Sequence, residues 1–287
     1  GKGTIMTEAF VRHESGVQYL TSPLLDAHGV PHLFSLRGGG VSAGVFASLN
    51  FAQGSGGLRD TAENVLENHA RAAAVFGLPV SRVCRSYQTH SLTVRLVDDR
   101  DAGRGLTLPP FDGGVDGLYT RTPALLLSVR YADCVPVLLC DRRSGAVAAV
   151  HSGWRGTLGG ITANAVRALT AGGADAADIL AAIGPCARRC CYEVSAELYD
   201  AFVRKDGALR AAFTPAGTAG KYLLDLPAVI RADLRRLGVS DAQISDCGVC
   251  TICGGDDYFS HRVMGENRGT MAAFIKMPEK GNEKQCH

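Results

Sequence analysis

Hydrophobic positions follow a helical spacing in several segments of the chain. Residues 61–77 carry an apolar stripe of this kind, and Gly77 is placed to end the helix. The stripe consists of Val65, Leu66, Ala70, Ala73 and Val75. The same spacing recurs later in the chain, at residues 157–173, 195–205 and 226–238. The pattern therefore predicts amphipathic helices in these segments.

Shorter runs of aliphatic and β-branched residues, separated by Asp, Gly and Pro, predict strands. These runs are residues 92–97, 115–120, 124–130, 135–141, 146–151, 179–185, 244–249 and 270–277. Because strands and helices are interleaved without strict alternation, we expect an α/β (α+β) fold with a mixed sheet covered by helices. A regular βαβ barrel is not expected.

Neither a change in composition nor a Pro- or Ser-rich linker divides the chain. We therefore expect one domain over residues 21–278. Residues 1–20 are expected to form a flexible N-terminal segment, and the polar residues 279–287 a frayed tail.

The overall charge of the chain excludes several classes of partner. A formal net charge of +2 and a pI of about 8.1 give no electrostatic footprint for nucleic acid.

No apolar run approaches the roughly 18 residues that span a bilayer, and no signal-peptide pattern is present. We expect a cytoplasmic protein with no membrane partner, whose ten cysteines are mostly reduced thiols.

Three residues at the ends of predicted strands form a candidate metal site. His90 and Cys134 each precede a strand, and His151 ends one. Two imidazoles and a thiolate suit Zn²⁺, and three protein ligands leave a fourth position open for water or substrate. The separations of 44 and 17 residues match no local zinc motif, and a cysteine in the position of Cys134, taken alone, is more often a small buried hydrophobic residue.

The turn after His151 offers groups that suit an anionic ligand. Gly153 and Gly156 let the backbone approach a ligand, and the next helix begins here. Arg155 is a candidate for binding phosphate or carboxylate, although an exposed surface charge is the simpler interpretation. Trp154 is either a packing anchor or a surface on which a base stacks.

Several stretches, in this order, resemble the bacterial YfiH family. They are RGGGVSAGVFASLN, QTH, DGLYT, ADCVPVLL, AAVHSGWRGT, IGPCARRCCYEV, CTIC with YFSHR, and NRGTMAAFI, and they extend from about residue 34 to 276. The resemblance implies a single three-layer α/β/α domain with a mixed β-sheet, related to cysteine hydrolases. It also implies a purine nucleoside phosphorylase acting on adenosine, inosine or methylthioadenosine, with an additional adenosine deaminase activity.

The resemblance also implies roles for individual residues. Zn²⁺ would be bound by His90, Cys134 and His151, and the small-molecule substrates would be a purine nucleoside and phosphate. The substrate-binding residues implied or suggested are Arg37, Gln88, Trp154 and Arg155. A monomer or weak homo-oligomer is expected. The chain departs from the family pattern by an extra glycine after Arg37 and by His69, where the family commonly has arginine.

The two reactions implied by the resemblance require catalytic groups, and the sequence offers more than one candidate for some of them. Phosphorolysis requires groups that bind phosphate, for which we expect Arg37 and Arg155. Deamination requires a proton carrier, either Asp133 or Glu193, although the signature of cytidine-type zinc deaminases is absent. Cys134 could instead act as a catalytic nucleophile, but a metal-bound thiolate is a poor nucleophile.

Further functions suggested by the family compete with this one. A multi-copper oxidase would need about ten histidines in H-x-H pairs, whereas the chain has eight and no such pair, which argues against a laccase.

Editing of a peptidoglycan precursor by amide hydrolysis is a second enzymatic hypothesis. A binding module is a third, and it predicts four protein ligands around a structural zinc and no open pocket.

The spacing C-x-x-C-x-x-C at Cys247, Cys250 and Cys253 is typical of iron–sulfur ligation but lacks a fourth thiolate in the same run. Cys186, Cys190 and Cys191 are the candidates for that fourth ligand. Reduced thiols near a strand end are the preferred interpretation.

Overall fold

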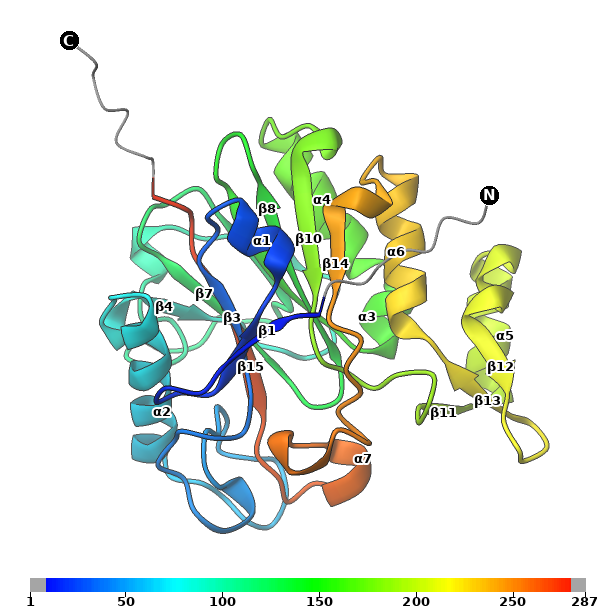
Figure 1. Cartoon of the computed structure of the whole chain (residues 1–287), viewed down its shortest axis with the longest axis horizontal. Coiled ribbons are helices and arrows are strands. Elements are labelled where there is room, and N and C mark those ends of the chain that lie inside the picture. Colours follow the sequence, from blue (N-terminus) through cyan, green and yellow to red (C-terminus); the bar gives the residue numbers. More distant parts are fainter. Residues whose placement is uncertain (1–8, 280–287) are drawn as a thin grey trace.

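The computed structural model describes residues 9–279, which form two large sheets, one small sheet and the helices around them (Figure 1). The strands are β1 (Val11–His13), β2 (Tyr19–Thr21), β3 (His32–Ser35), β4 (Val83–Arg85), β5 (Val94–Leu96), β6 (Gly117–Thr120), β7 (Leu126–Tyr131), β8 (Val135–Asp141), β9 (Val147–Ser152), β10 (Ile179–Ile183), β11 (Glu193–Ser195), β12 (Phe213–Pro215), β13 (Lys221–Leu224), β14 (Ile244–Asp246) and β15 (Met271–Ile275). The helices are α1 (Pro23–Ala27), α2 (Ala62–Val75), α3 (Trp154–Gly159), α4 (Ile161–Ala171), α5 (Ala196–Lys205), α6 (Leu226–Arg236) and α7 (His261–Met264).

Both large sheets contain parallel and antiparallel neighbours. The first has the strand order β1-β2-β3-β15-β7-β4, and only β4 and β7 are parallel in it. The second has the order β14-β10-β8-β9-β6-β5, with parallel pairs at its two edges. The predicted mixed α/β architecture is therefore confirmed.

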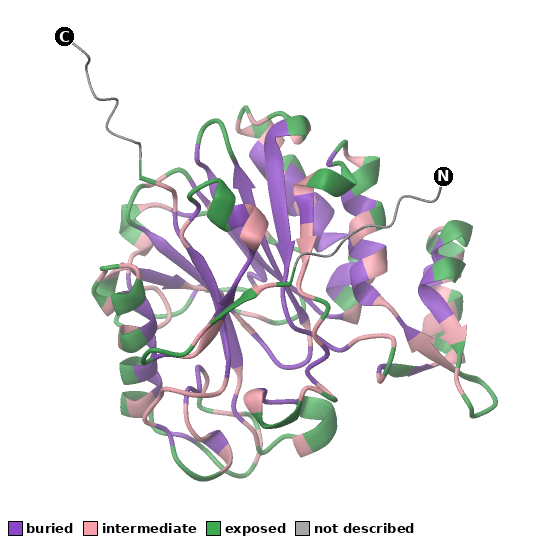
Figure 2. Cartoon of the chain, in the orientation of Figure 1, coloured by how far each residue is buried: buried purple, intermediate pink, exposed green. Residues whose placement is uncertain are grey.

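The two large sheets pack face to face around a shared hydrophobic core. Alternate residues of β7 and β15, such as Leu127 and Ala273, meet alternate residues of β8 and β9, such as Leu138 and Ala149. The opposite face of the first sheet packs against α2, and that of the second against α4 and α6. The described chain thus has helices outside and two sheets inside, and the central strands are buried throughout (Figure 2).

This arrangement corrects the expected single sheet in three layers. Residues 135–141 are buried at all seven positions, so β8 must be covered on both faces. A continuous apolar run predicts that both faces of a strand are buried. It does not tell whether a helix or a second sheet covers each face. The kinship with cysteine hydrolases stays a prediction.

The predicted helices form with altered boundaries and faces. The Thr61 side chain caps α2 by accepting a hydrogen bond from the backbone N–H of Asn64. Leu66 and Val75 are exposed, so part of the predicted apolar stripe is wrong. The buried face consists of Val65, Asn68, His69, Ala72 and Ala73. The helix predicted over residues 157–173 is divided by Gly160, whose φ of 82° interrupts it.

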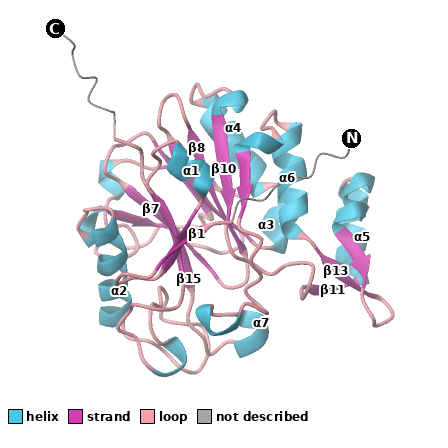
Figure 3. Cartoon of the chain, viewed as in Figure 1, coloured by secondary structure: helices cyan, strands magenta, loops and turns pink. Residues whose placement is uncertain are grey.

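The small sheet lies beside the large ones. It has the order β11-β13-β12 and packs with α5, to one side of the main body (Figure 3). No helix within residues 9–279 is long and apolar enough to cross a membrane.

The predicted domain limits are only partly covered by the described residues. In the predicted N-terminal segment 1–20, residues 1–8 lie outside the described part of the chain. The remainder of this segment includes β1 and the first two residues of β2, which pair with each other in the first sheet. The predicted tail 279–287 lies outside the described residues except for Glu279. The single domain over residues 21–278 and the cytoplasmic location stay predictions.

Candidate active site

The chain crosses from the first large sheet to the second at two of the three proposed metal ligands. His90 lies between β4 and β5, and Cys134 lies between β7 and β8. His151 lies in β9, opposite Pro136 of β8. One potential ligand atom from each of the three residues lies within 4.8 Å of the others. The predicted convergence of these distant residues is therefore confirmed.

Asp116, which the sequence analysis missed, is the buried centre of this site. Its carboxylate accepts hydrogen bonds from the backbone N–H groups of Thr89 (3.0 Å), His90 (3.1 Å) and Ser91 (2.8 Å). It also accepts bonds from Ser91 Oγ at 2.7 Å and from His151 Nδ1 at 2.8 Å. Burial opposes ionisation, but the hydrogen bonds from His151 and Ser91 lower the pKa of Asp116 to about 2.

Asp116 also orients His151. A hydrogen bond from Nδ1 to this carboxylate leaves Nε2 as the ring nitrogen available to a metal. Burial disfavours the charged imidazolium, yet Cys134 and Asp116 raise the pKa of His151 to about 9. The surroundings of His151 therefore favour a positive charge, which a metal ion bound to the neutral imidazole would also supply. The only feature of the sequence that pointed to Asp116 was its position just before a strand, and an acidic residue there is also typical of a turn.

Gly153 leaves the space that the ligand atoms occupy. A Cβ atom at this position would lie 2.9 Å from Cys134 Sγ and 2.9 Å from His90 Nδ1. Any side chain here would push the thiol and the imidazole away. Burial and the nearby His151 lower the pKa of His90, which favours the neutral imidazole that metal coordination requires.

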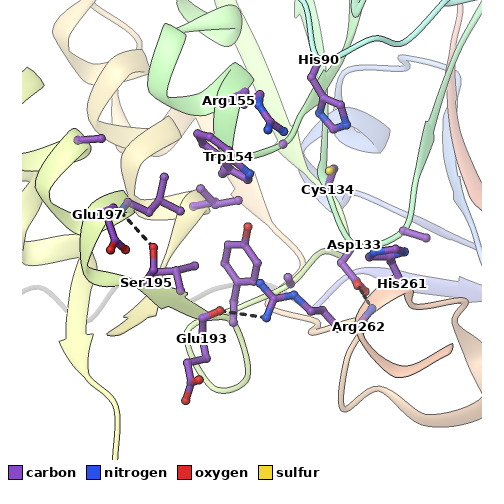
Figure 4. A pocket seen from close by; sticks show the side chains of 18 of the residues that line it. His90, Asp133, Cys134, Trp154, Arg155, Glu193, Ser195, Glu197, His261 and Arg262 are labelled. Atoms are coloured by element: carbon purple, nitrogen blue, oxygen red, sulfur yellow. Dashed lines mark hydrogen bonds between the residues drawn. The ribbon is translucent and has the colours of Figure 1, made fainter. Parts of the chain in front are cut away.

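A cavity of about 940 Å³ opens beside His90 and Cys134 (Figure 4). Trp154 and Arg155 lie on its His90 side, and the Arg155 guanidinium stacks 4.3 Å from the centre of a Trp154 ring. Tyr192 and Arg262 form another part of the wall, with the guanidinium 4.7 Å from the ring centre. The predicted residues Trp154 and Arg155 thus lie at the cavity, together with an aromatic residue that the sequence analysis did not select.

Asp133 also lines this cavity, but both of its carboxylate oxygens are engaged. Oδ1 accepts a hydrogen bond from Thr251 Oγ1 at 2.6 Å, and Oδ2 accepts one from the backbone N–H of Arg262 at 2.9 Å (Figure 4 draws the second). Glu193, the second candidate proton carrier, is exposed at the far rim. The geometry favours Asp133 as a residue that fixes the backbone beside Cys134.

A second cavity, of about 610 Å³, reaches the same three ligands and is lined by arginines. The guanidinium groups of Arg85, Arg130 and Arg268 have no carboxylate within 4.0 Å among residues 9–279, and each Nε is buried without a hydrogen-bond partner. Burial lowers the pKa of Arg130 to about 10, and burial with the nearby Arg130 lowers that of Arg85. Partly buried cations without a carboxylate partner form a site that suits an anion.

Two predicted substrate-binding residues are placed differently from the expectation. Arg37 lines a separate cavity of about 390 Å³, where its Nε donates to the Ala47 carbonyl at 2.5 Å, so it is not brought together with the metal ligands. Gln88 lies at the arginine-lined cavity, but its amide pairs with the backbone N–H and carbonyl of Arg130 at 2.7 and 2.9 Å. That amide holds the His90 loop against β7.

The chain matches a known family over nearly its whole length. Residues 31–278 correspond to the family described as multi-copper polyphenol oxidoreductase laccase. The chain belongs to this laccase family. YlmD of Geobacillus stearothermophilus, named a purine nucleoside phosphorylase, is 35% identical over 249 residues, which are 83% of this chain and 86% of that protein. Adenosine deaminase RL5, from an unknown prokaryotic organism, is 33% identical over 84% of this chain and 91% of that protein.

A solved structure of the laccase family has the same fold. The crystal structure of the Bacillus licheniformis hypothetical protein YfiH matches with a TM-score of 0.81 and 31% identity, over 93% of this chain and 98% of that chain. The predicted membership of the YfiH family is therefore confirmed.

The ligand groups of this chain differ from what the laccase name suggests. Within residues 9–279, the groups of three or more potential metal ligands are His90 with Cys134 and His151, and a set of four cysteines. A multi-copper cluster needs many more imidazoles close together than either group offers.

Proposed function

We propose that the protein is a zinc-dependent purine nucleoside phosphorylase that acts on adenosine, inosine or methylthioadenosine. The observation that carries this proposal is the position of the His90, Cys134 and His151 group between two cavities. One cavity has aromatic walls that suit a purine nucleoside, and the other has unpaired arginines that suit phosphate. The names of the relatives support the same reaction.

The donor set fits zinc. Two imidazoles and one thiolate are a common ligand set of Zn²⁺ in catalytic sites, where a fourth position stays open. Asp116 fixes the tautomer of His151, and Gly153 leaves room for the thiol and the second imidazole. When bound, the ion would supply positive charge that stabilises negative charge developing on the substrate.

The arginine-lined cavity is the proposed phosphate site, in place of the Arg37 and Arg155 pair expected from the sequence. Arg85 ends β4, Arg130 lies in β7, and Arg268 precedes β15, so three separate segments direct guanidinium groups to one space. Phosphate bound there would offset the cost of partly burying their charges. It would also lie next to the proposed metal ligands, which line the same cavity.

The larger cavity is the proposed nucleoside site. The Trp154 ring is accessible from the cavity beside His90, which suits stacking of a purine base. Arg268 lines both cavities and would contact phosphate and ribose at their junction. His90, Cys134 and Arg268 line both cavities, so the chain's own groups would hold the two substrates next to each other, as direct transfer requires.

Adenosine deamination is a second proposed activity of the same site. The name of the relative RL5 supports it. Amide hydrolysis and a purely structural zinc receive less support from the geometry. Cys134 belongs to the metal-ligand group, which disfavours its role as a free nucleophile in amide hydrolysis. A closed structural zinc would need four protein ligands, whereas this group offers three and borders two cavities.

The test is to incubate zinc-loaded protein with adenosine, with and without inorganic phosphate, and to separate the products. We expect adenine and ribose 1-phosphate only when phosphate is present, and inosine in either condition if deamination also occurs. The His90→Ala protein is the control and should form neither product. Fully zinc-loaded protein that releases neither adenine nor inosine, but releases an amino acid from a muropeptide precursor, would refute the proposal in favour of editing.

A further inference from the structure

Four cysteines on two distant segments form a second group of potential metal ligands, far in sequence from the first. Cys190 and Cys191 lie in the loop before β11, and Cys250 and Cys253 lie in the turns after β14. Their four Sγ atoms lie within 4.8 Å of one another. We call these four residues the thiol group. Neither the sequence spacing nor the proposed reaction accounts for their convergence.

The spacing of the sulfur atoms matches one tetrahedral metal ion. In a tetrahedron with Zn–S bonds of about 2.3 Å, neighbouring sulfur atoms are about 3.8 Å apart. Cys190 Sγ and Cys253 Sγ are separated by 3.8 Å. The whole thiol group is too compact to enclose the several iron and sulfide atoms of an iron–sulfur cluster.

Cys247 does not take part, which corrects the iron–sulfur interpretation of the C-x-x-C-x-x-C run. Its sulfur lies 3.6 Å from an Arg188 nitrogen and 3.5 Å from the backbone nitrogen of Val249. Cys186 is likewise outside the thiol group. The metal-ligand pattern therefore consists of one adjacent pair and one C-x-x-C pair, each on its own loop.

The backbone holds the two loops together without the sulfur atoms. The N–H of Cys186 donates to the carbonyl of Val249 at 3.3 Å, and the N–H of Thr251 donates to the carbonyl of Cys186 at 3.0 Å. The thiol group is thus assembled before any ion binds. Cys190 and Cys253 are exposed, so an ion can enter from solvent, whereas Cys250 is 7% exposed and lies at the base.

The four sulfur atoms offer an all-thiolate ligand set. Soft thiolate ligands in tetrahedral geometry select zinc or a single iron among common metals.

We propose that Cys190, Cys191, Cys250 and Cys253 bind one structural zinc ion in a closed tetrahedral site. This site is separate from the proposed catalytic metal and does not depend on the reaction proposed above. Because all four positions are taken by protein thiolates, the ion has no place for substrate and acts as a crosslink between the two loops.

The crosslink would stabilise the wall of the large cavity. Thr251, between the two cysteines of the C-x-x-C pair, donates a hydrogen bond to the Asp133 carboxylate, and Ala187 N–H donates to the Asp133 carbonyl at 2.8 Å. Tyr192 directly follows Cys191 and lines the cavity. Zinc bound to the thiol group would therefore fix both loops that hold Asp133, next to Cys134.

The first experiment counts zinc in full-length protein purified under reducing conditions without chelators. The wild type should contain about two equivalents, and the Cys190→Ser and Cys253→Ser double variant about one, because one closed site is lost. Cys247→Ser is the matched control from the same loop and should keep both. His90→Ala should keep the ion of the thiol group, which separates this result from the proposed catalytic function.

The second experiment remains decisive if the double variant does not fold. His90→Ala protein is stripped and reloaded with Co²⁺, which should give the intense visible bands of tetrahedral cobalt together with thiolate-to-metal charge-transfer bands. The absence of these bands would overturn the proposal. So would iron with acid-labile sulfide in the purified protein, or a mass under non-reducing conditions that shows Cys190 and Cys253 joined as a disulfide.

Discussion

Replacing Asp116 with asparagine tests whether this carboxylate sets up the metal ligands. The substitution keeps the size of the side chain but removes its charge and one acceptor oxygen. Oδ1 accepts bonds from Thr89 N–H and from both the N–H and Oγ of Ser91, whereas Oδ2 accepts from His90 N–H and His151 Nδ1. An amide that keeps the three bonds at Oδ1 must direct its NH₂ group at two other donors.

The size of the effect follows from those two donors. To accept a bond from the new NH₂ group, His151 would have to move its proton to Nε2, the nitrogen that is needed by the metal. Loss of such a supporting partner lowers metal affinity about 10- to 100-fold, which corresponds to about 1.4–2.7 kcal/mol. The unpaired N–H of His90 would reduce the free energy of unfolding of the metal-free protein by about 1–3 kcal/mol.

Competition with a chelator measures zinc affinity, and urea unfolding measures the stability of the metal-free protein. Asp60→Asn is the matched control, because Asp60 is also buried and accepts bonds from Ser42, Asn50, Asn64 and Thr61. It should lose stability but keep zinc affinity. The reasoning would be refuted if folded Asp116→Asn bound zinc within roughly twofold of the wild type, well short of the expected loss.

Three further substitutions test other parts of the site. Gly153→Ala adds a Cβ against Cys134 and His90, at a cost of about 1–3 kcal/mol, so zinc titration should show at least roughly fivefold weaker binding. Arg130→Met should raise the KM for phosphate about 10- to 100-fold, while urea unfolding without phosphate shows equal or greater stability, because a partly buried charge without a carboxylate partner is removed. Trp154→Ala should raise the KM for adenosine by an amount that corresponds to about 1–3 kcal/mol if the base stacks on this ring. Trp154→Phe should restore most of the lost binding free energy, and an unchanged KM in Trp154→Ala would exclude stacking.

The convergence of the three proposed metal ligands could be predicted from the sequence, but the residues that support them could not. His90, Cys134 and His151 stand at the ends of apolar runs, where side chains reach a common sheet edge. Asp116 precedes a glycine, a pair that is also typical of an ordinary turn. Its role depends on the loop at residues 89–91 folding over it, which no local pattern encodes.

The arginines of the proposed phosphate site were missed for a related reason. Arg85 and Arg130 lie within or at the end of β-strands, where an isolated arginine normally reads as a solvent-exposed position. Their convergence results from the parallel pairing of β4 and β7, which places Arg85 opposite Ser128, two residues from Arg130. The family resemblance favours Arg37, but the stretch that contains it packs against Asp257 on another part of the surface.

The two crossings that lead from the first large sheet to the second each depend on one buried carboxylate. Asp116 holds the crossing that carries His90, and Asp133 lies within the crossing that carries Cys134. The cores on either face of the sheets do not depend on these contacts, so the sheets can stay folded while a ligand is displaced. In Asp116→Asn, amide exchange should therefore rise at residues 86–93 and stay low in β8 and β9. Thr251 binds Asp133 from within the C-x-x-C turn. Loss of the ion from the thiol group should therefore raise amide exchange in the crossing that carries Cys134 instead. The roles of Asp116 and Asp133 can thus be tested separately.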